Sequence, residues 1–194
     1  MAIRTHHQIN DSIWFITFTC YNWLPLFELT SSYDLVYNWL NLIKAKYGIY
    51  TCGFVIMPNH VHVLLCLSNQ EVNLNTVVSN GKRFMAYELV KRLQLINAGM
   101  LSQLADACTD KEKAKGQLHK VFEPSFDAKP VYNDGFFHQK LDYIHHNPVS
   151  GKWNLCVEYT DYPHSSAAFY KDALPHEKVN ITDYRELDEL GLNC

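Results

Sequence analysis

Two histidines and a distant tyrosine–asparagine pair are the side chains in this sequence best suited to act together in chemistry. His60 and His62 stand one residue apart, and Tyr143 precedes Asn147 by four residues. Two imidazoles and an amide oxygen can bind a hard divalent metal such as Mg²⁺ or Mn²⁺ and leave room for phosphate oxygens and water. A metal bound in this way polarises a phosphodiester, and a tyrosine hydroxyl beside it is a candidate nucleophile.

The histidines lie in an apolar stretch that is typical of buried strands. Residues 54–65 are almost all apolar and often β-branched, and only Pro58-Asn59 interrupts them. This pattern predicts two strands, residues 49–57 and 60–67, paired as a hairpin around a tight turn. Because side chains alternate between the two faces of a strand, His60 and His62 project from one face about 7 Å apart.

Tyr143 and Asn147 fall in a predicted helix that Asn133 or Asp134 caps and that ends before Pro148. A separation of four residues puts both side chains on one helix face, about 6 Å apart along the axis. If this face packs against the histidines, Asn147 becomes a third metal ligand and the Tyr143 hydroxyl lies over the open coordination sites.

The tyrosine needs help to act as a nucleophile. A free tyrosine has a pKa near 10, so its phenolate lies roughly 4 kcal/mol uphill at pH 7. The field of a metal and a neighbouring base can offset this cost. His145, His146 and metal-bound water are all candidate proton acceptors, and the sequence does not choose among them.

Each of these residues also has a structural interpretation. The two histidines are equally typical of a core or an interface, or of the metal site of an unrelated β-barrel oxygenase. Tyr143 is one of twelve tyrosines, most of which pack, and Asn147 before a proline is typical of a helix end. The combination of residues on elements that can meet favours the functional interpretation.

The rest of the chain supplies further elements of a mixed α and β fold. Residues 12–20 predict a strand with Thr17 and Thr19 on one face, and residues 21–27 a loop. One helix begins after Thr30 or Ser31 and ends at Gly48. Beyond the second helix, residues 100–117 predict a helix followed by a mobile insertion. Residues 121–126 and 129–132 predict either a short strand or a paired extended arm.

The second helix carries the main basic cluster of the chain. It begins at Asn73, and its predicted apolar stripe includes Phe84, with basic side chains outside the stripe. A solvated helix face is an equal interpretation of this cluster. The basic residues are Lys82, Arg83, Lys91 and Arg92.

Length and composition predict one domain, residues 1–170, followed by a C-terminal extension, residues 171–194. The chain has 194 residues with 47% hydrophobic content, enough for one core. No apolar run approaches the roughly 20 residues that span a bilayer and no signal peptide is evident, so we expect a cytoplasmic protein without a membrane partner. Six scattered cysteines without a CxxC pair argue against a disulfide framework or a structural zinc site.

A net charge of −3 argues against broad nucleic-acid binding, so any such site must be local.

Two motifs, in this order and at this separation, resemble the single-tyrosine insertion-sequence transposases, in particular the REP-associated tyrosine transposases. These are HUH endonucleases, named for the histidine–hydrophobic–histidine run. The resemblance covers residues 13–170. It rests on Ile56 to His62 and Leu141 to Val149, followed by Asp161-Tyr162-Pro163 and Ser165-Ser166-Ala167.

The resemblance implies a ferredoxin-like or RRM-like α+β fold, an antiparallel sheet with helices packed on it. It further implies that Tyr143 attacks single-stranded or hairpin DNA, leaving a 5′-phosphotyrosine link and a free 3′-hydroxyl, and that His60, His62 and Asn147 bind the metal. Lys82 and Arg83 match a helix that is often basic in relatives. Where relatives commonly have an arginine after Asn-Pro-Val, this chain has Ser150-Gly151-Lys152, so Lys152 is a substitute candidate for DNA binding.

Three functions follow from these patterns. The first is a metal-dependent DNA strand transferase with a tyrosine nucleophile. The second is a domesticated protein that binds hairpin DNA without cutting it, which the net charge of −3 favours. The third is a metal hydrolase that uses bound water. Relatives occur as monomers and as dimers, so the resemblance is compatible with a homodimer.

Overall fold

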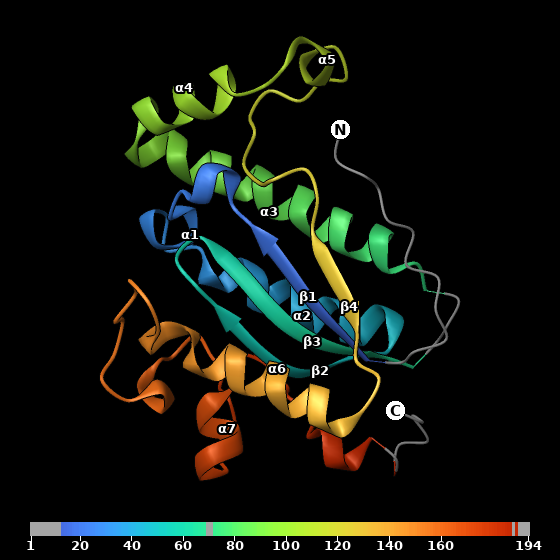
Figure 1. Ribbon diagram of the computed structural model, residues 1–194. Coiled ribbons are helices and arrows are strands. Elements are labelled where there is room, and N and C mark those ends of the chain that lie inside the picture. The colour runs from blue at the N-terminus through green and yellow to red at the C-terminus, as the bar shows by residue number, and fades with distance from the viewer. Residues whose placement is uncertain (1–12, 69–71, 188, 190–194) are drawn as a thin grey trace.

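A four-stranded antiparallel sheet forms the centre of the protein (Figure 1). The computed structural model describes residues 13–68, 72–187 and 189. The sheet order is β2-β3-β1-β4, and the strands are β1 (Ile13–Thr19), β2 (Ile49–Ile56), β3 (His60–Leu67) and β4 (Asp127–Pro130). Helix α2 (Tyr33–Tyr47) connects β1 to β2, and α3 (Leu74–Ile96) lies between β3 and β4. This βαββαβ order with antiparallel pairing is ferredoxin-like, so the predicted α+β fold is confirmed.

Helices cover both faces of the sheet (Figure 1). On one face α2 and α3 pack on Trp14, Ile16 and Phe18 of β1. On the other face α6 (Asp134–His146) packs on the strand side chains that point away from α2 and α3, such as Phe15 and Leu64. Strand β3 therefore has two buried faces, which explains its nearly continuous apolar sequence. The remaining short elements are η1 (Tyr21–Trp23), α1 (Leu26–Leu29), α4 (Ala98–Asp106), α5 (Asp110–Lys113), η2 (Asn147–Val149), η3 (Tyr159–Asp161), α7 (Ala167–Asp172) and η4 (Tyr184–Glu186).

Local signals set the ends of the long helices as predicted. The Asn73 side chain accepts a hydrogen bond from the Thr76 amide at 3.0 Å, and the Asn133 side chain accepts one from the Phe136 amide at 2.8 Å. Helix α2 ends at Gly48, whose φ of 64° is left-handed. The predicted start of α2 is wrong by one or two residues, because Ser32 precedes its first turn and makes no capping hydrogen bond.

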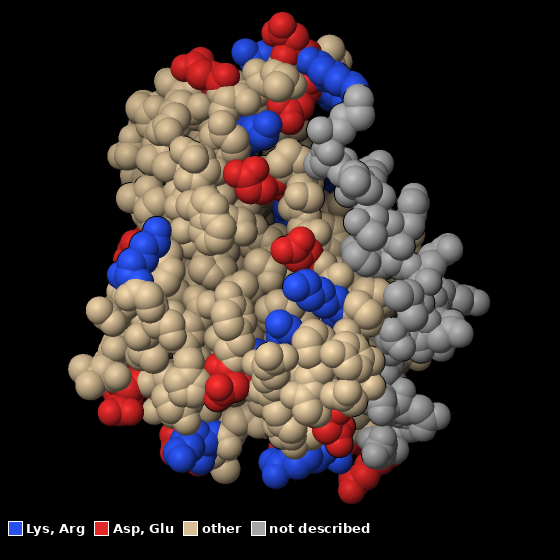
Figure 2. Space-filling view, viewed as in Figure 1, with Lys and Arg blue, Asp and Glu red and all other residues tan. Residues whose placement is uncertain are grey.

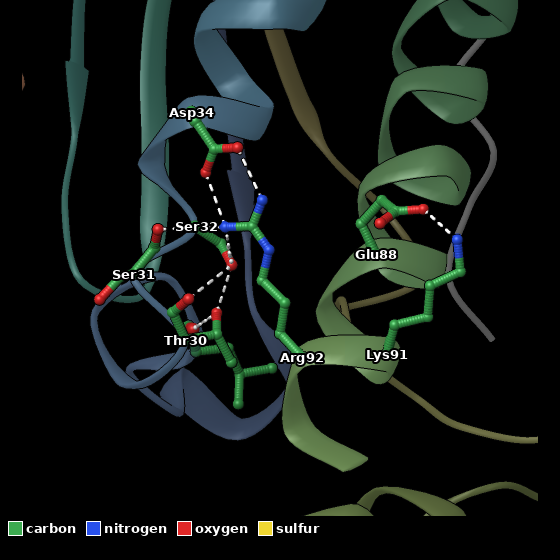
Figure 3. A network of polar contacts seen from close by, with 8 residues as sticks. Thr30, Ser31, Ser32, Asp34, Glu88, Lys91 and Arg92 are labelled. Carbon is green, nitrogen blue, oxygen red and sulfur yellow. Dashed lines mark hydrogen bonds and ion pairs between the residues drawn. The ribbon is translucent and has the colours of Figure 1, made fainter. Parts of the chain in front are cut away.

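An arginine–aspartate pair ties α3 to the start of α2 (Figure 3). The Arg92 guanidinium donates to both carboxylate oxygens of Asp34, at 2.7 and 2.6 Å, and to the Ser31 carbonyl at 3.1 Å. This paired geometry holds the pKa of Asp34 below its usual value. Arg92 of the predicted basic cluster therefore serves helix packing.

Three sequence predictions differ from the structure. Residues 21–27 are not a plain loop, because Leu26 and Phe27 are fully buried in helix α1 and the Phe27 amide donates to the Pro58 carbonyl at 3.0 Å. Phe84 lies outside the buried stripe of α3 with 58% of its surface exposed, and lines a groove between α2 and α3. The fourth strand begins at Asp127, two residues before the predicted segment 129–132, whereas Phe122 pairs with Cys20 in an isolated bridge, as a paired extended arm does.

The described part of the predicted C-terminal extension packs on the sheet. The Thr182 amide donates to the Thr51 carbonyl at 2.9 Å, beside an isolated bridge between Thr51 and Ile181. Val179 and Leu187 are buried, one in each core. The domain boundary at residue 170 stays a prediction. Among the described residues, no helix has both the length and the apolar character to cross a membrane.

Candidate functional site

The two histidines of β3 face α6 and are nearly buried. Strand register pairs His62 with Thr17 and His60 with Thr19 of β1, so all four side chains belong to the same face. His60 is 4% exposed and His62 is 5% exposed, and their ring centroids lie 4.7 Å apart. Burial lowers the pKa of His60 to about 4 and that of His62 to about 3, so both rings are neutral at pH 7.

Hydrogen bonds define the tautomer of His60. The Asn59 amide nitrogen donates to the Trp23 carbonyl at 2.9 Å, which leaves the Asn59 oxygen as an acceptor. His60 Nδ1 lies 2.6 Å from that oxygen and must therefore carry the proton. In the neutral ring, Nε2 then has a free lone pair, as a metal ligand requires. The Asn147 side chain is close enough to the His60 ring to raise its pKa, against the larger effect of burial.

His62 has one partnered and one unpartnered ring nitrogen. Its Nδ1 lies 2.6 Å from Thr17 Oγ1. Its Nε2 is buried and has no hydrogen-bond partner among the described residues. A buried polar atom without a partner is costly unless something binds it. If Nδ1 donates to Thr17, then Nε2 offers its lone pair on the same side of the sheet as His60.

These residues fit a divalent metal. The two neutral imidazole rings lie 4.7 Å apart, the Asn147 side chain lies next to His60, and the buried His62 Nε2 has no hydrogen-bond partner among the described residues. Nitrogen and amide-oxygen donors suit Mn²⁺, and Mg²⁺ when substrate oxygens complete the coordination. Within residues 13–68, 72–187 and 189, no group of three or more His, Cys, Asp or Glu side chains is arranged to hold a metal. The candidate site therefore depends on the amide as its third donor.

Helix α6 brings Tyr143 to the histidines. The Tyr143 ring lies 5.0 Å from the His62 ring and 6.2 Å from the Phe15 ring, centroid to centroid. Half of its surface is exposed, at 50%, so a ligand in solvent can reach it. The close approach of α6 depends on Gly53 of β2, where a Cβ atom would lie 2.7 Å from Leu141 Cδ1. The structure thus brings Tyr143, Asn147 and both histidines together.

The two histidines considered as proton acceptors point elsewhere. His145 is 6% exposed and its Nε2 lies 2.9 Å from Ser166 Oγ, under the helix. Burial lowers its pKa to about 4. His146 Nδ1 lies 3.0 Å from the Asp142 carbonyl, and its ring packs on Tyr159 at 4.4 Å.

The predicted DNA-binding side chains have different environments. Lys82 is 8% exposed, and its ammonium donates to the carbonyls of Glu123 and Ser125 at 2.7 and 3.0 Å. The prediction that Lys82 stands outside the apolar stripe is therefore wrong, because burial on α3 forces it to bind backbone carbonyls and lowers its pKa to about 8. Arg83 is exposed, but α3 packs on the sheet face opposite to the histidines. Lys152 is exposed near His60, with its Nζ 5.4 Å from the centre of the Trp153 ring.

Sequence reasoning missed Lys140, the cation closest to the tyrosine ring on α6. Its Nζ lies 5.9 Å from the Tyr143 ring centre and 5.0 Å from that of Phe15. Its charge also contributes to the low pKa of His62. The signal was available, since residues three apart on a helix are neighbours.

Charge on the surface is mixed. Figure 2 shows Lys and Arg in small groups beside Asp and Glu, with broad uncharged areas between them on this face. This agrees with a net charge of −3 and with a local site.

Among solved structures, this chain is similar to one of a REP-associated tyrosine transposase bound to a REP hairpin. The two are 19% identical, the alignment covers 95% of each chain, and the TM-score is 0.62. A candidate transposase from Deinococcus radiodurans R1 is 14% identical, with 73% of this chain and 95% of that chain covered and a TM-score of 0.40. No protein-family model and no curated protein matches the chain. The resemblance that the two motifs indicated is therefore present in the fold.

Proposed function

We propose that this protein is a metal-dependent nuclease and strand transferase of single-stranded or hairpin DNA, with Tyr143 as its nucleophile. The observation that carries the proposal is the contact between Tyr143 and His62, whose buried Nε2 has no partner among the described residues. The fold shared with a transposase that was solved on a DNA hairpin supports the choice of substrate. The assignment of residues 1–170 as the catalytic domain belongs to this proposal.

His60, His62 and Asn147 would hold Mg²⁺ or Mn²⁺, which when bound withdraws charge from the scissile phosphodiester. Tyr143 attacks phosphorus, the bond between phosphorus and O3′ breaks, and a 5′-phosphotyrosine link forms. The phenolic proton passes to a base in solvent, which reaches the half-exposed ring, and the departing O3′ takes up a proton. The same 3′-hydroxyl can reverse the step, which allows strand transfer.

Lys140 supports the attack from the same helix. Its ammonium lies beside the Tyr143 ring and is the nearest described cation over that face. A positive charge at this position attracts the DNA phosphate and stabilises charge that develops on its oxygens.

The test is covalent capture. The protein is incubated with Mn²⁺ or Mg²⁺ and hairpins with single-stranded flanks, taken from short palindromic repeats beside the gene, and protein–DNA adducts are separated under denaturing conditions. We expect adducts with the wild type and with Tyr87→Phe, a control tyrosine on α3 that is 59% exposed, and none with Tyr143→Phe. An adduct that survives Tyr143→Phe contradicts the assignment of the nucleophile.

Two other outcomes would identify the alternative functions. Metal-independent hairpin binding without any adduct would indicate a non-cleaving DNA-binding protein. Metal-dependent cleavage that persists in Tyr143→Phe without an adduct would indicate a hydrolase that uses water.

A further inference from the structure

Two tryptophan rings lie next to His60. The Trp23 ring lies 5.6 Å from the His60 ring, at an angle of 68°. The Trp153 ring lies 6.5 Å from it, at 46°. The other two tryptophans of the chain, Trp14 and Trp39, are buried at 2% and 6% exposure.

Trp23 is 58% exposed, so most of its side chain faces solvent rather than His60. A large apolar ring on the surface loses the stabilisation that burial would give. Its position beside a candidate metal ligand therefore calls for a binding partner rather than a packing explanation.

The backbone at Trp23 is held in an unfavourable conformation. Asn22 and Trp23 have φ of 50° and 55°, in the left-handed region that a bulky side chain rarely adopts. Three contacts hold the turn: the Asn22 amide donates to Glu123 Oε1 at 2.8 Å, the Trp23 amide to the Cys20 carbonyl at 3.1 Å, and Asn59 to the Trp23 carbonyl at 2.9 Å. Strain maintained in this way is characteristic of functional positions.

The second tryptophan comes from a similar turn directly after η2. Gly151 and Asn154 on either side of Trp153 have φ of 63° and 40°. The Leu155 amide donates to the Pro148 carbonyl at 2.9 Å and closes this turn against the helix end that carries Asn147. Lys152 places its ammonium 5.4 Å from the Trp153 ring centre. An aromatic surface and a cation thus stand together at the candidate metal site.

We propose that Trp23, with Trp153 and Lys152, binds an unpaired nucleobase and its phosphate in the single-stranded flank of the DNA substrate. The inference rests on the proposed function and specifies which part of the DNA is recognised. Indole rings stack on any base, which suits a flank that is held by shape and charge. Inside a duplex both faces of a base are covered by the neighbouring pairs, so the site selects unstacked bases of single-stranded DNA.

The experiment measures DNA binding by fluorescence anisotropy in EDTA, so that metal coordination does not contribute. Each protein is titrated with a hairpin that has a single-stranded flank and with the same hairpin without it. The variants are Trp23→Ala, Trp23→Phe and Tyr87→Ala, a control aromatic with nearly the same exposure, 59%, on the opposite helix layer.

Trp23→Ala should weaken binding of the flanked hairpin by about 5- to 150-fold, the range for losing one stacked base. It should change binding of the blunt hairpin by less than about twofold, and Tyr87→Ala should change neither. Trp23→Phe should retain part of the affinity, because the phenyl ring still stacks. One abasic position in the flank should weaken the wild type and leave Trp23→Ala unaffected, and this position identifies the stacked nucleotide.

Equal affinity of Trp23→Ala and wild type for the flanked hairpin overturns this inference. An equal loss on blunt and flanked hairpins also overturns it, because the tryptophan would then act on the duplex. If wild type still forms the Tyr143 adduct in either case, the proposed function stands. If wild type neither binds nor reacts with any hairpin, the proposed function fails and the inference falls with it.

Discussion

Replacing Gly53 by alanine should separate the tyrosine from the histidines without unfolding the protein. Gly53 lies on β2 under α6, where an added Cβ would lie 2.7 Å from Leu141 Cδ1 and 3.6 Å from both Leu64 Cδ1 and Ser166 Oγ. Ordinary contacts between carbon atoms are about 3.5–4.0 Å. The leucine end or the whole helix must therefore move by about 1 Å.

The magnitude follows from this overlap. Inserting one methyl group into a packed core costs about 1–3 kcal/mol, which is less than the typical stability of a domain. A displacement of about 1 Å at a reacting group costs about 100-fold in rate. Gly53→Ala should therefore remain folded and form the DNA adduct more slowly, by up to about 100-fold when the whole shift passes into the helix, because Tyr143 and Asn147 lie on that helix while His60 and His62 stay on β3.

Gly81→Ala is the matched control. Gly81 lies in the opposite layer, between α2 and α3. A Cβ atom added there would contact the rigid indole of Trp39 at Nε1, and at Cδ1 at 2.8 Å. Gly81→Ala should lower the free energy of unfolding at least as much as Gly53→Ala but leave the adduct rate within a few-fold of wild type. Unfolding is measured in urea and the adduct rate by quenched time points at saturating Mn²⁺.

A second change tests the direct cause. Leu141→Val removes the Cδ1 atom that the new methyl group would meet, so the double variant should recover much of the lost rate. The reasoning is refuted if Gly53→Ala reacts at the wild-type rate, or if it loses no more rate than Gly81→Ala.

Four further predictions concern the groups around the site. Thr17→Val removes the partner of His62 Nδ1 and should weaken Mn²⁺ binding about 10- to 100-fold, measured by titration calorimetry, and unchanged affinity would argue against an orienting role. Lys140→Gln should slow adduct formation more than Lys91→Gln, an exposed lysine on α3 in the opposite layer, and equal rates would remove Lys140 from the mechanism. The free energy of unfolding in EDTA should be full above pH 6.5 and decline towards pH 4, because the fold holds the pKa of His164 at about 4 and only the unfolded chain takes up that proton. The decline is at most about 1.4 kcal/mol per pH unit for one histidine. It should be shallower in His164→Phe, and an unchanged slope would contradict this cause. Trp23→Gly relieves the left-handed backbone, so it should keep the free energy of unfolding or raise it by about 1 kcal/mol. The same change should weaken binding of flanked DNA. A large loss of stability would show that the ring supports the fold.

Local regularities in the sequence determined the elements and the side on which each candidate residue stands. Alternation along β3 put His60 and His62 on one face, and the four-residue spacing put Tyr143 and Asn147 on one side of α6. Pro58-Asn59, Asn73 and Asn133 marked the hairpin and the helix starts, because turns and caps depend on neighbouring residues only.

Tertiary structure alone decided which faces meet and which side chains remain free. Lys82 and Arg83 are neighbours in a basic cluster, yet packing of α3 buries the first and exposes the second. The tautomer of His60 depends on Asn59 and on the carbonyl of Trp23, 36 residues away from that asparagine. Such contacts join segments that are distant along the chain, and periodicity within one segment carries no information about its partner. The meeting of Tyr143 with His62, across some eighty residues, is a property of the packed fold.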